Sequence, residues 1–541
     1  MHPMPSVSPG ERARTWAAPL AIVLLAALIR WHFFVGFGVT GDDFIYAGMS
    51  DGLARRGWPA VDLRYGVNYR LGLSVPLALL FRTFGASDLA YVIYPLLASL
   101  VGIVLVFVLG RRLFGSTVGL TAAFLVATCP FDAVFASSMT IDVITSCLTA
   151  ITVLAFLAAR ESSVARCVAY ALIGAAATLV AYMIKEPAVY VLPVLGVLTL
   201  TRIRDRGVVL RDVVFGGLVA AGLAATLAAD FLATGDALNR VHVQWPQSGA
   251  ASGPVRETLL LYPRWVWLRT PEGTMPFGYL FYALVPALLY LAVRRPARAH
   301  VPLLWLLVLV LLLEFLPKDL HPLTLSPRYA RYAHAWIAPA SLVVAVALDA
   351  VRRWRRGVFW VCLAVLATSG LVEARTLHRV WTDPLSDRND AASFLAALPV
   401  KAVYADFWLL GRYSFAMQYA LTLNTPWAIN GKPLQTEVIE RNDFATLWTI
   451  PEGYVVTGGS RGAEVGMSSV LNLKGNVPPP TWRLLEEIAR PLGIRRLEPL
   501  RVWEVIPMSD GDARPDACFP FSISLRHPSS PSGRYDRSMG T

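Results

Sequence analysis

Long apolar segments separated by short polar connections fill the first 372 residues of the chain. A membrane-spanning helix needs about 20 mostly apolar residues, and eleven segments approach this length, although 188–201 is short. They are residues 16–35, 89–109, 118–136, 143–159, 168–184, 188–201, 213–233, 277–293, 301–316, 335–351 and 358–372. The pattern therefore predicts a polytopic α-helical membrane protein with about eleven spans.

The basic residues indicate how these spans are oriented. Arginines collect in alternate connections, on the same side as the N-terminus, at 111–112, 160–166, 202–211, 294–298 and 352–356. Because short cytoplasmic loops carry an excess of Lys and Arg, we expect the N-terminus to be cytoplasmic. The extracytoplasmic connections are then 36–88, 131–142, 185–187, 234–276 and 317–334, and everything after about Glu373 lies outside as well.

The region after the last predicted span has a different character. It is mixed and polar, with helical patterns at 388–398, 407–423 and 481–489 and strand-like patterns at 400–405, 454–457 and 500–506. We expect a transmembrane domain over residues 1–374 and a small extracytoplasmic α/β domain over 375–508. Residues 509–541 are rich in Pro, Ser, Gly and Arg, a composition typical of a disordered tail.

Composition agrees with a membrane protein and excludes one class of partner. Of 541 residues, 55% are hydrophobic and 16% charged, which is too apolar for one soluble core. The formal net charge of +12 comes from short basic clusters between apolar segments, as cytoplasmic loops require, so nucleic acid is not expected as a partner. The five cysteines show no disulfide or metal-site spacing.

The first outer connection contains two further helical patterns. Ile45, Met49 and Leu53 recur at helical spacing, which predicts a short helix lying on the membrane interface. A second short helix is expected at 71–84, ended by Gly85. The acidic pair Asp42-Asp43 lies at the start of the first of these helices.

Ionisable side chains gather at the ends of the predicted spans, above all at the outer ends. Such groups are costly in hydrocarbon and usually mark function there. The outer ends carry Asp42, Asp43, Asp142, Lys185, Glu186, Asp230, Lys318, Asp319, Arg328 and Arg331. Carboxylates beside several cations on one membrane face suit glycosyl transfer, in which a base activates a hydroxyl and cations hold a phosphate leaving group.

These residues also have purely structural explanations. The acidic pair Asp42-Asp43 could complement the dipole in the first turn of the interfacial helix, and Asp142 could cap the fourth span. Lys185 could be an anchor whose ammonium reaches the interface. Arg328 and Arg331, with the tyrosines that follow each of them, could form an interfacial belt.

Several motifs, taken together, resemble the GT-C superfamily of membrane glycosyltransferases, in particular the group of protein O-mannosyltransferases and lipid A aminoarabinose transferases. The resemblance covers residues 16–372 in order. It rests on Asp42-Asp43-Phe44-Ile45-Tyr46, Leu80-Phe81-Arg82-Thr83-Phe84-Gly85, Arg111-Arg112-Leu113-Phe114-Gly115, Pro130 followed by Asp142, Lys185-Glu186-Pro187, and Arg331-Tyr332 with Pro339. The chain departs from the family pattern at Asp43, Glu186 and Ser137, where the family commonly has Glu, Gly and a basic residue.

The resemblance implies a role for each matching residue. Asp42 or Asp43, with Asp42 the first choice, would be the general base for the acceptor hydroxyl. Lys185 and one of Arg328 or Arg331, beside Tyr332, would bind the phosphate of a polyprenyl-phosphate sugar, and Asp142 would orient the acceptor or Lys185. Direct displacement would invert the anomeric carbon. No cofactor is implied with certainty; a divalent metal ion is left open because the acids are paired, although no firm ligand set is visible.

The function expected on this basis is transfer of a hexosyl or pentosyl group from a polyprenyl-phosphate donor to an extracytoplasmic glycan, lipid or protein. The expected location is a bacterial cytoplasmic membrane, with the active site and the C-terminal domain outside. One alternative is a transporter or flippase of lipid-linked glycans, although such proteins typically place ionisable or broken segments at the bilayer midplane. Another is a family member without catalytic activity whose outer domain binds a partner.

Overall fold

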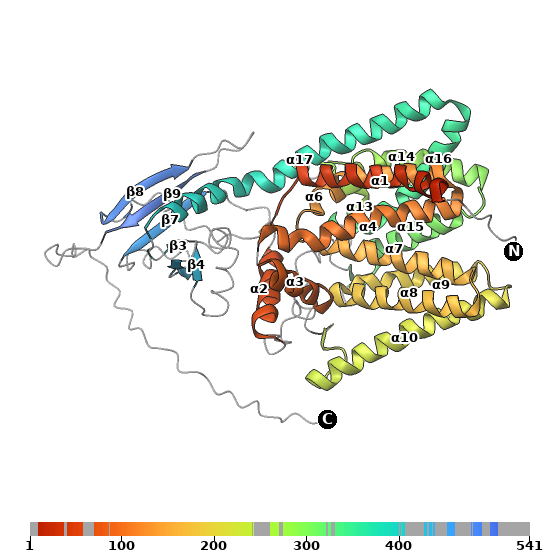
Figure 1. Ribbon diagram of the computed structural model, residues 1–541, viewed down its shortest axis with the longest axis horizontal. Coiled ribbons are helices and arrows are strands. Elements are labelled where there is room, and N and C mark those ends of the chain that lie inside the picture. Colours follow the sequence, from red (N-terminus) through yellow and green to blue (C-terminus); the bar gives the residue numbers. More distant parts are fainter. Residues whose placement is uncertain are drawn as a thin grey trace.

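In the computed structural model a helical bundle is joined to a small β-sheet by one long helix (Figure 1). The structure describes residues 9–36, 41–57, 70–85, 87–240, 242, 260–269, 274–320, 323–325, 330–399, 401, 403–405, 427–429, 432–434, 436–438, 452–459, 478, 480–488 and 498–506. For some of these, including Asp42 and Asp43, only the backbone is described. The mostly helical architecture confirms the predicted class.

Every predicted span coincides with helix. The bundle contains α1 (Pro9–His32), α4 (Asp88–Phe114), α5 (Ser116–Ala127), α6 (Pro130–Phe135), α7 (Ile141–Arg160), α8 (Val164–Ile184), η3 (Glu186–Tyr190), α9 (Val191–Leu200), α10 (Arg206–Thr234), α13 (Leu261–Trp267), α14 (Leu280–Arg294), α15 (His300–Phe315), η5 (Ala330–Trp336), α16 (Ile337–Trp354) and α17 (Arg356–Ala397).

Six helical segments in the described part of the chain are long and apolar enough to cross a membrane. They lie at 89–114, 141–160, 164–184, 206–234, 330–354 and 356–382, and the other predicted spans lie on shorter apolar helices. The number eleven is therefore not confirmed. The segment predicted at 118–136 is broken, because Pro130 ends the continuous pattern and starts the separate helix α6.

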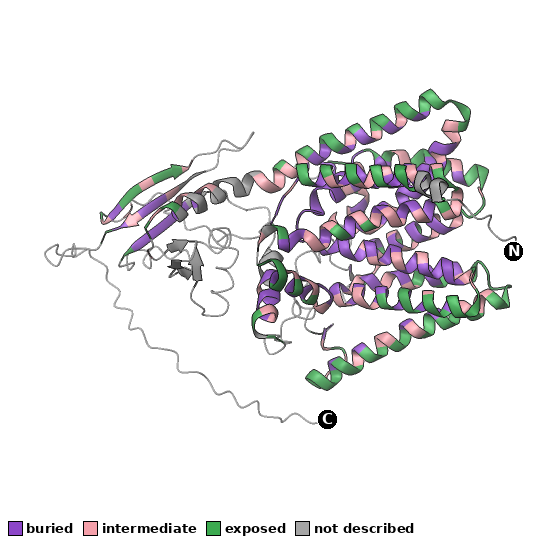
Figure 2. Ribbon diagram, viewed as in Figure 1, coloured by how far each residue is buried: buried purple, intermediate pink, exposed green. Residues whose placement is uncertain are grey.

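Burial follows the pattern expected of a bundle that faces lipid. The central helices α5, α7 and α16 are mostly buried, whereas α10 and α17 carry large exposed apolar side chains. Figure 2 shows the long exposed stretches of α10 and α17. Small residues allow the close packing inside. A Cβ added at Gly119 would lie 2.6 Å from the Phe107 carbonyl oxygen, so α4 and α5 meet backbone to backbone.

Two short helices, α2 (Gly41–Arg56) and α3 (Leu71–Phe84), lie at the end of the bundle away from the N-terminus (Figure 1). Both were predicted from the first outer connection. Gly72 brings α3 against α8, since a Cβ there would lie 2.6 Å from the Val180 carbonyl oxygen and 2.9 Å from Ile184 Cγ1. The acidic pair Asp42-Asp43 is therefore in the first turn of a helix whose neighbour packs on the end of α8.

The last helix of the bundle passes through the predicted domain boundary. α17 runs without a break from Arg356 to Ala397, so residues 374 and 375 lie inside it, and the helical pattern predicted at 388–398 forms its end. Its C-terminal part contacts two strands of the sheet. Figure 1 shows the sheet on the same side of the bundle as α2 and α3.

The sheet is mixed and has the strand order β6-β3-β7-β9-β8. Its strands are β3 (Val403–Ala405), β6 (Thr436–Val438), β7 (Gly453–Gly459), β8 (Trp482–Ile488) and β9 (Glu498–Val505). β3 is parallel to β6 and β7, and β9 is antiparallel to β7 and β8. Two further antiparallel strand pairs are described: β1 (Pro317–Leu320) with β2 (Leu323–Leu325), and β4 (Trp427–Ile429) with β5 (Lys432–Leu434).

One secondary-structure prediction in this domain is wrong. The helical pattern at 481–489 is strand β8, because pairing with β9 outweighs the local spacing of apolar residues. Opposite charges face each other across the two strands: Arg501 Nε lies 2.7 Å from Glu487 Oε2, and Arg483 pairs with Glu504. The strands predicted at 400–405, 454–457 and 500–506 are confirmed as β3, β7 and β9, while 407–423 and 509–541 lie outside the described residues.

Candidate active site

The centre of the candidate site is an ion pair between Asp142 and Lys185. Asp142 lies in the first turn of α7, and its Oδ1 accepts a hydrogen bond from Lys185 Nζ. Lys185 follows the last residue of α8 and has an extended backbone, since Pro187 leads the chain into η3 instead of continuing the helix. Both side chains are buried. Residues 43 positions apart in the sequence therefore meet at one end of the bundle.

The helix η5 adds an aromatic ring and a second cation. The Lys185 ammonium lies 3.4 Å from the centre of the Tyr332 ring, a cation–π contact. Arg331 Nε lies 3.9 Å from Asp142 Oδ2, and this oxygen accepts no hydrogen bond from any of the residues that the structure describes. Four of the predicted site residues, Asp142, Lys185, Arg331 and Tyr332, thus converge.

A third cation links this cluster to α2. Arg70 precedes α3, and its guanidinium lies 5.2 Å from the centre of the Tyr46 ring. Tyr46 is buried and belongs to the motif that contains Asp42 and Asp43. The side chains of Asp42 and Asp43, and the whole of Arg328, lie outside the described residues. Their predicted roles stay predictions.

The cluster lowers the pKa of Lys185, which lies outside the spans. Burial is the largest cause, because it disfavours the charged ammonium. The positive charges of Arg331 and Arg70 act in the same direction, and Asp142 opposes them. Together they lower the pKa of Lys185 to about 7. The lysine is therefore a cation that titrates near neutral pH.

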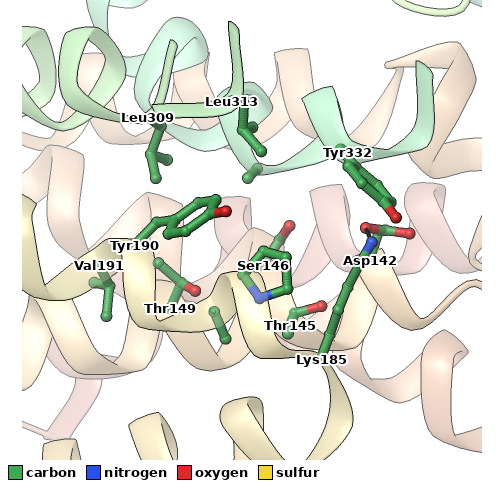
Figure 3. A pocket seen from close by; sticks show the side chains of 13 residues that line it. Asp142, Thr145, Ser146, Thr149, Lys185, Tyr190, Val191, Leu309, Leu313 and Tyr332 are labelled. Atoms are coloured by element: carbon green, nitrogen blue, oxygen red, sulfur yellow. Dashed lines mark hydrogen bonds and ion pairs between the residues drawn. The ribbon is translucent and has the colours of Figure 1, made fainter. Parts of the chain in front are cut away.

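A pocket opens beside this cluster (Figure 3). One wall is polar and comes from a single face of α7, where Asp142, Thr145, Ser146 and Thr149 follow one another at helical spacing. The other walls are mostly apolar and come from η3, α9, α15 and η5. They consist of Pro187, Ala188, Tyr190, Val191, Leu309, Leu313, Tyr332 and Ala335, with Lys185 at the rim of the polar wall.

Two structural explanations considered for these residues do not match the geometry. Asp142 does not cap α7, because Thr140 occupies the N-cap position. Lys185 does not extend to a surface, since its ammonium is buried against Asp142 and Tyr332. Asp230, another predicted outer-end carboxylate, has a different cation as its neighbour, with Arg240 Nε at 4.0 Å.

A second buried polar cluster was missed by the sequence analysis. Arg30 of α1 pairs with Asp132 of α6, and His334 Nε2 lies 2.9 Å from Asp132 Oδ1. All three side chains are buried. Arg30 and Asp132 lie within segments predicted as spans, where a lone charge is costly. Two opposite charges inside predicted spans could therefore have been recognised from the sequence as a candidate ion pair.

A metal site is not visible in the described part of the chain, where no group of three or more His, Cys, Asp or Glu side chains is arranged to hold an ion. The metal ion left open by the sequence analysis therefore has no ligand set among these residues.

Comparison with known proteins supports a membrane glycosyltransferase fold. A sequence model of the family described as dolichyl-phosphate-mannose-protein mannosyltransferase matches residues 74–228. A search of curated protein sequences finds no match. Among solved structures, ArnT from Cupriavidus metallidurans in the apo state is similar, with 15% sequence identity, a TM-score of 0.57, and coverage of 91% of this chain and 98% of ArnT.

Two further solved structures are similar. ArnT from the same organism bound to undecaprenyl phosphate has 15% identity and a TM-score of 0.56, covering 92% of this chain and 98% of the other. The oligosaccharyltransferase of Archaeoglobus fulgidus in the apo form has 13% identity and a TM-score of 0.50, covering 82% and 70%. The predicted resemblance to this group of glycosyltransferases is thereby confirmed, and the chain has the fold of ArnT. The six long apolar helical segments support an integral membrane protein.

Proposed function

We propose that this protein transfers a sugar from a polyprenyl-phosphate donor to an extracytoplasmic acceptor, with inversion at the anomeric carbon. The observation that carries the proposal is the meeting of Lys185 and Arg331 at one carboxylate, Asp142, at the end of the bundle where α2 lies. The positive charge of Arg70 also acts on Lys185. A related fold, that of ArnT, has been solved with undecaprenyl phosphate bound.

The cations would hold the phosphate of the donor. Lys185 and Arg331 both face Asp142 now, and a phosphate entering beside them would accept charge-assisted hydrogen bonds from the same donors. Arg328 is the alternative to Arg331 for this role. Negative charge that develops on the leaving phosphate in the transition state would be stabilised by groups already in position.

The carboxylates would supply the base. In the proposed step the acceptor hydroxyl oxygen attacks the anomeric carbon, and a bond forms between them as the bond from that carbon to the phosphate oxygen breaks. The proton of the hydroxyl passes to Asp42, or to Asp43, and the electron pair of the broken bond leaves with the polyprenyl phosphate. Asp142 would orient the acceptor or Lys185.

The acceptor is proposed to be an envelope glycan, a lipid or a protein on the outer side of a bacterial cytoplasmic membrane. This proposal rests on the arrangement of α2, α3 and the sheet on one side of the bundle, opposite to the N-terminus (Figure 1).

The test is transfer by the purified protein in detergent from a panel of undecaprenyl-phosphate sugars, with product detection by mass spectrometry. We expect Asp42→Asn to reduce the rate by 10²- to 10⁴-fold, the usual contribution of a general base. Asp51→Asn is the matched control, because it changes a carboxylate on the same helix that pairs with Arg55. If Asp42→Asn, Asp43→Asn and the double variant all transferred like the parent, the base assignment would be abandoned.

The same preparation separates transfer from transport. Movement of a labelled undecaprenyl-phosphate sugar across the bilayer of proteoliposomes, without a covalent product for any acceptor offered, would contradict the proposed reaction. It would favour a flippase of lipid-linked glycans instead.

A further inference from the structure

Ser146 in the polar wall of the pocket is held by a chain of buried groups. Its Oγ lies 2.8 Å from His334 Nδ1, and the other nitrogen of that ring, Nε2, lies 2.9 Å from Asp132 Oδ1. The other carboxylate oxygen of Asp132 accepts hydrogen bonds from Arg30 and from the Ser99 hydroxyl, the latter at 2.7 Å. A surface of the pocket is thus connected to a charge pair inside the bundle.

The other two nitrogens of Arg30 also donate hydrogen bonds. Its Nε donates to Ser99 Oγ at 2.7 Å, and its Nη1 donates to the carbonyl oxygens of Ala26 at 3.0 Å and Ala127 at 3.1 Å. Arg30, Asp132 and His334 are at most 5% exposed. A polar network satisfied in this way is rigid, because every alternative arrangement leaves a buried group without a partner.

Charge balance fixes the direction of the hydrogen bonds. Arg30 and Asp132 neutralise each other, so a neutral imidazole keeps the buried cluster without net charge, whereas a protonated one would add an uncompensated charge. The Asp132 carboxylate can only accept, so Nε2 of His334 carries the ring proton. Nδ1 is then an acceptor, and the Ser146 hydroxyl must donate to it. Ser146 Oγ then keeps its lone pairs as acceptors, and Ser146 is one of the residues that line the pocket.

We propose that Ser146 is a substrate-binding residue that accepts a hydrogen bond from a hydroxyl or amino group of the donor sugar, and that His334, Asp132 and Arg30 are positioning residues that fix it as an acceptor. The proposal rests on the proposed function. Ser146 lies one helical turn, about 6 Å along the axis, from Asp142, where the phosphate would be held. A sugar attached to that phosphate would reach the hydroxyl.

The other occupant of the pocket would be the prenyl chain. A prenyl chain has no group that can donate to a hydroxyl fixed as an acceptor. A sugar hydroxyl that enters the pocket, by contrast, needs a hydrogen-bond acceptor there, because burying it without one is costly. The wall of α7 carries three hydroxyls, those of Thr145, Ser146 and Thr149 (Figure 3). The Thr145 hydroxyl donates to the Ile141 carbonyl of its own helix, at 2.5 Å. The polar wall therefore favours the sugar.

The experiment compares two lipids, undecaprenyl phosphate and undecaprenyl-phosphate mannose, for binding to the full-length protein in detergent. Ser146→Ala should weaken binding of the mannose lipid by roughly 3- to 10-fold, the effect of one neutral hydrogen bond, and leave that of undecaprenyl phosphate unchanged. Thr226→Val, which removes a buried hydroxyl that donates to the Gly222 carbonyl of its own helix, α10, away from the pocket lining, should change neither affinity. His334→Gln should reproduce the selective loss seen for Ser146→Ala.

Other binding results would contradict either the contact of Ser146 with the sugar or the proposed function. If Ser146→Ala bound the mannose lipid like the parent, or lost affinity for both lipids equally, Ser146 would not contact the sugar, while the proposed function would stand. If the parent bound neither lipid, the proposed function itself would fail. Nitrogen-15 NMR of labelled histidine, assigned with His334→Gln, gives a readout that is independent of binding: a proton on Nδ1 of His334 would contradict the direction of the relay.

Discussion

Replacing Lys185 by Met and Asp142 by Asn should have different effects on the affinity for undecaprenyl phosphate. Lys185 and Arg331 both lie against Asp142, and the positive charge of Arg70 also acts on Lys185, so three cations stand beside one carboxylate in this group of described side chains before a phosphate arrives. Lys185→Met removes a charge-assisted contact to phosphate, worth about 1.5–3 kcal/mol. This predicts roughly 10- to 150-fold weaker binding.

Asp142→Asn acts in the opposite sense. The carboxylate now accepts the hydrogen bond of Lys185 and lies 3.9 Å from Arg331 Nε, so it competes with the phosphate for both cations. Asparagine at this position carries no charge, so the affinity for undecaprenyl phosphate should stay unchanged or rise. The transfer rate should fall if Asp142 orients the acceptor. Leaving Lys185 beside two other cations without a carboxylate lowers the stability of the protein, so both variants are compared only as folded, monodisperse fractions.

The assay is equilibrium binding of radiolabelled undecaprenyl phosphate to purified protein in detergent. Arg166→Met is the matched control, because it removes an exposed positive charge from the other end of α8, about 28 Å from Lys185 along the helix. The charge argument would be refuted if Lys185→Met bound like the parent. It would also fail if Asp142→Asn lost as much affinity as Lys185→Met, since the intact ion pair would then be what binding requires.

Three other predictions follow from single features of the structure. The pKa of Lys185 is lowered to about 7, mainly by burial, so the lysine loses its charge as pH rises through that value. The affinity for undecaprenyl phosphate should therefore fall between pH 6 and 8.5 in the parent, but not in Lys185→Arg. Gly72→Ala should lower stability by about 1–3 kcal/mol and reduce the thermal unfolding midpoint, whereas Gly196→Ala, which meets open space, should not. Arg30→Met should cost about 3–5 kcal/mol in the same measurement, and adding Asp132→Leu should recover part of the loss.

The sequence was sufficient to predict where helices occur, because a run of apolar residues in a membrane protein must satisfy its backbone within the segment. It was not sufficient to count spans, since Pro130 divides one apolar segment and several others are shorter than a bilayer requires. The β8 strand was misread for a different reason. Its apolar residues are spaced as in a helix, and only its pairing with β9, which lies elsewhere in the sequence, decides the structure.

The candidate site was predicted in part. Asp142, Lys185, Arg331 and Tyr332 were selected because they stood at outer span ends and in motifs that resemble those of a glycosyltransferase superfamily, and these four do meet. No pattern in the sequence could place them together, because the contacts join α7, α8 and η5 across long separations. Ser146 was missed for a related reason: a serine in an apolar helix is unremarkable until the residue that faces it is known.

The geometry of η5 explains how two separate clusters can share one pocket. In a 3₁₀-helix, side chains three residues apart point the same way, and three residues rise about 6 Å. Arg331 and His334 are such a pair, and they face Asp142 and Ser146, which are four residues apart on α7 and also separated by about 6 Å. One turn of η5 therefore matches one turn of α7. Because His334 is held by Asp132, the buried pair with Arg30 fixes the register in which Arg331 meets Asp142, and so links the interior of the bundle to the proposed phosphate site.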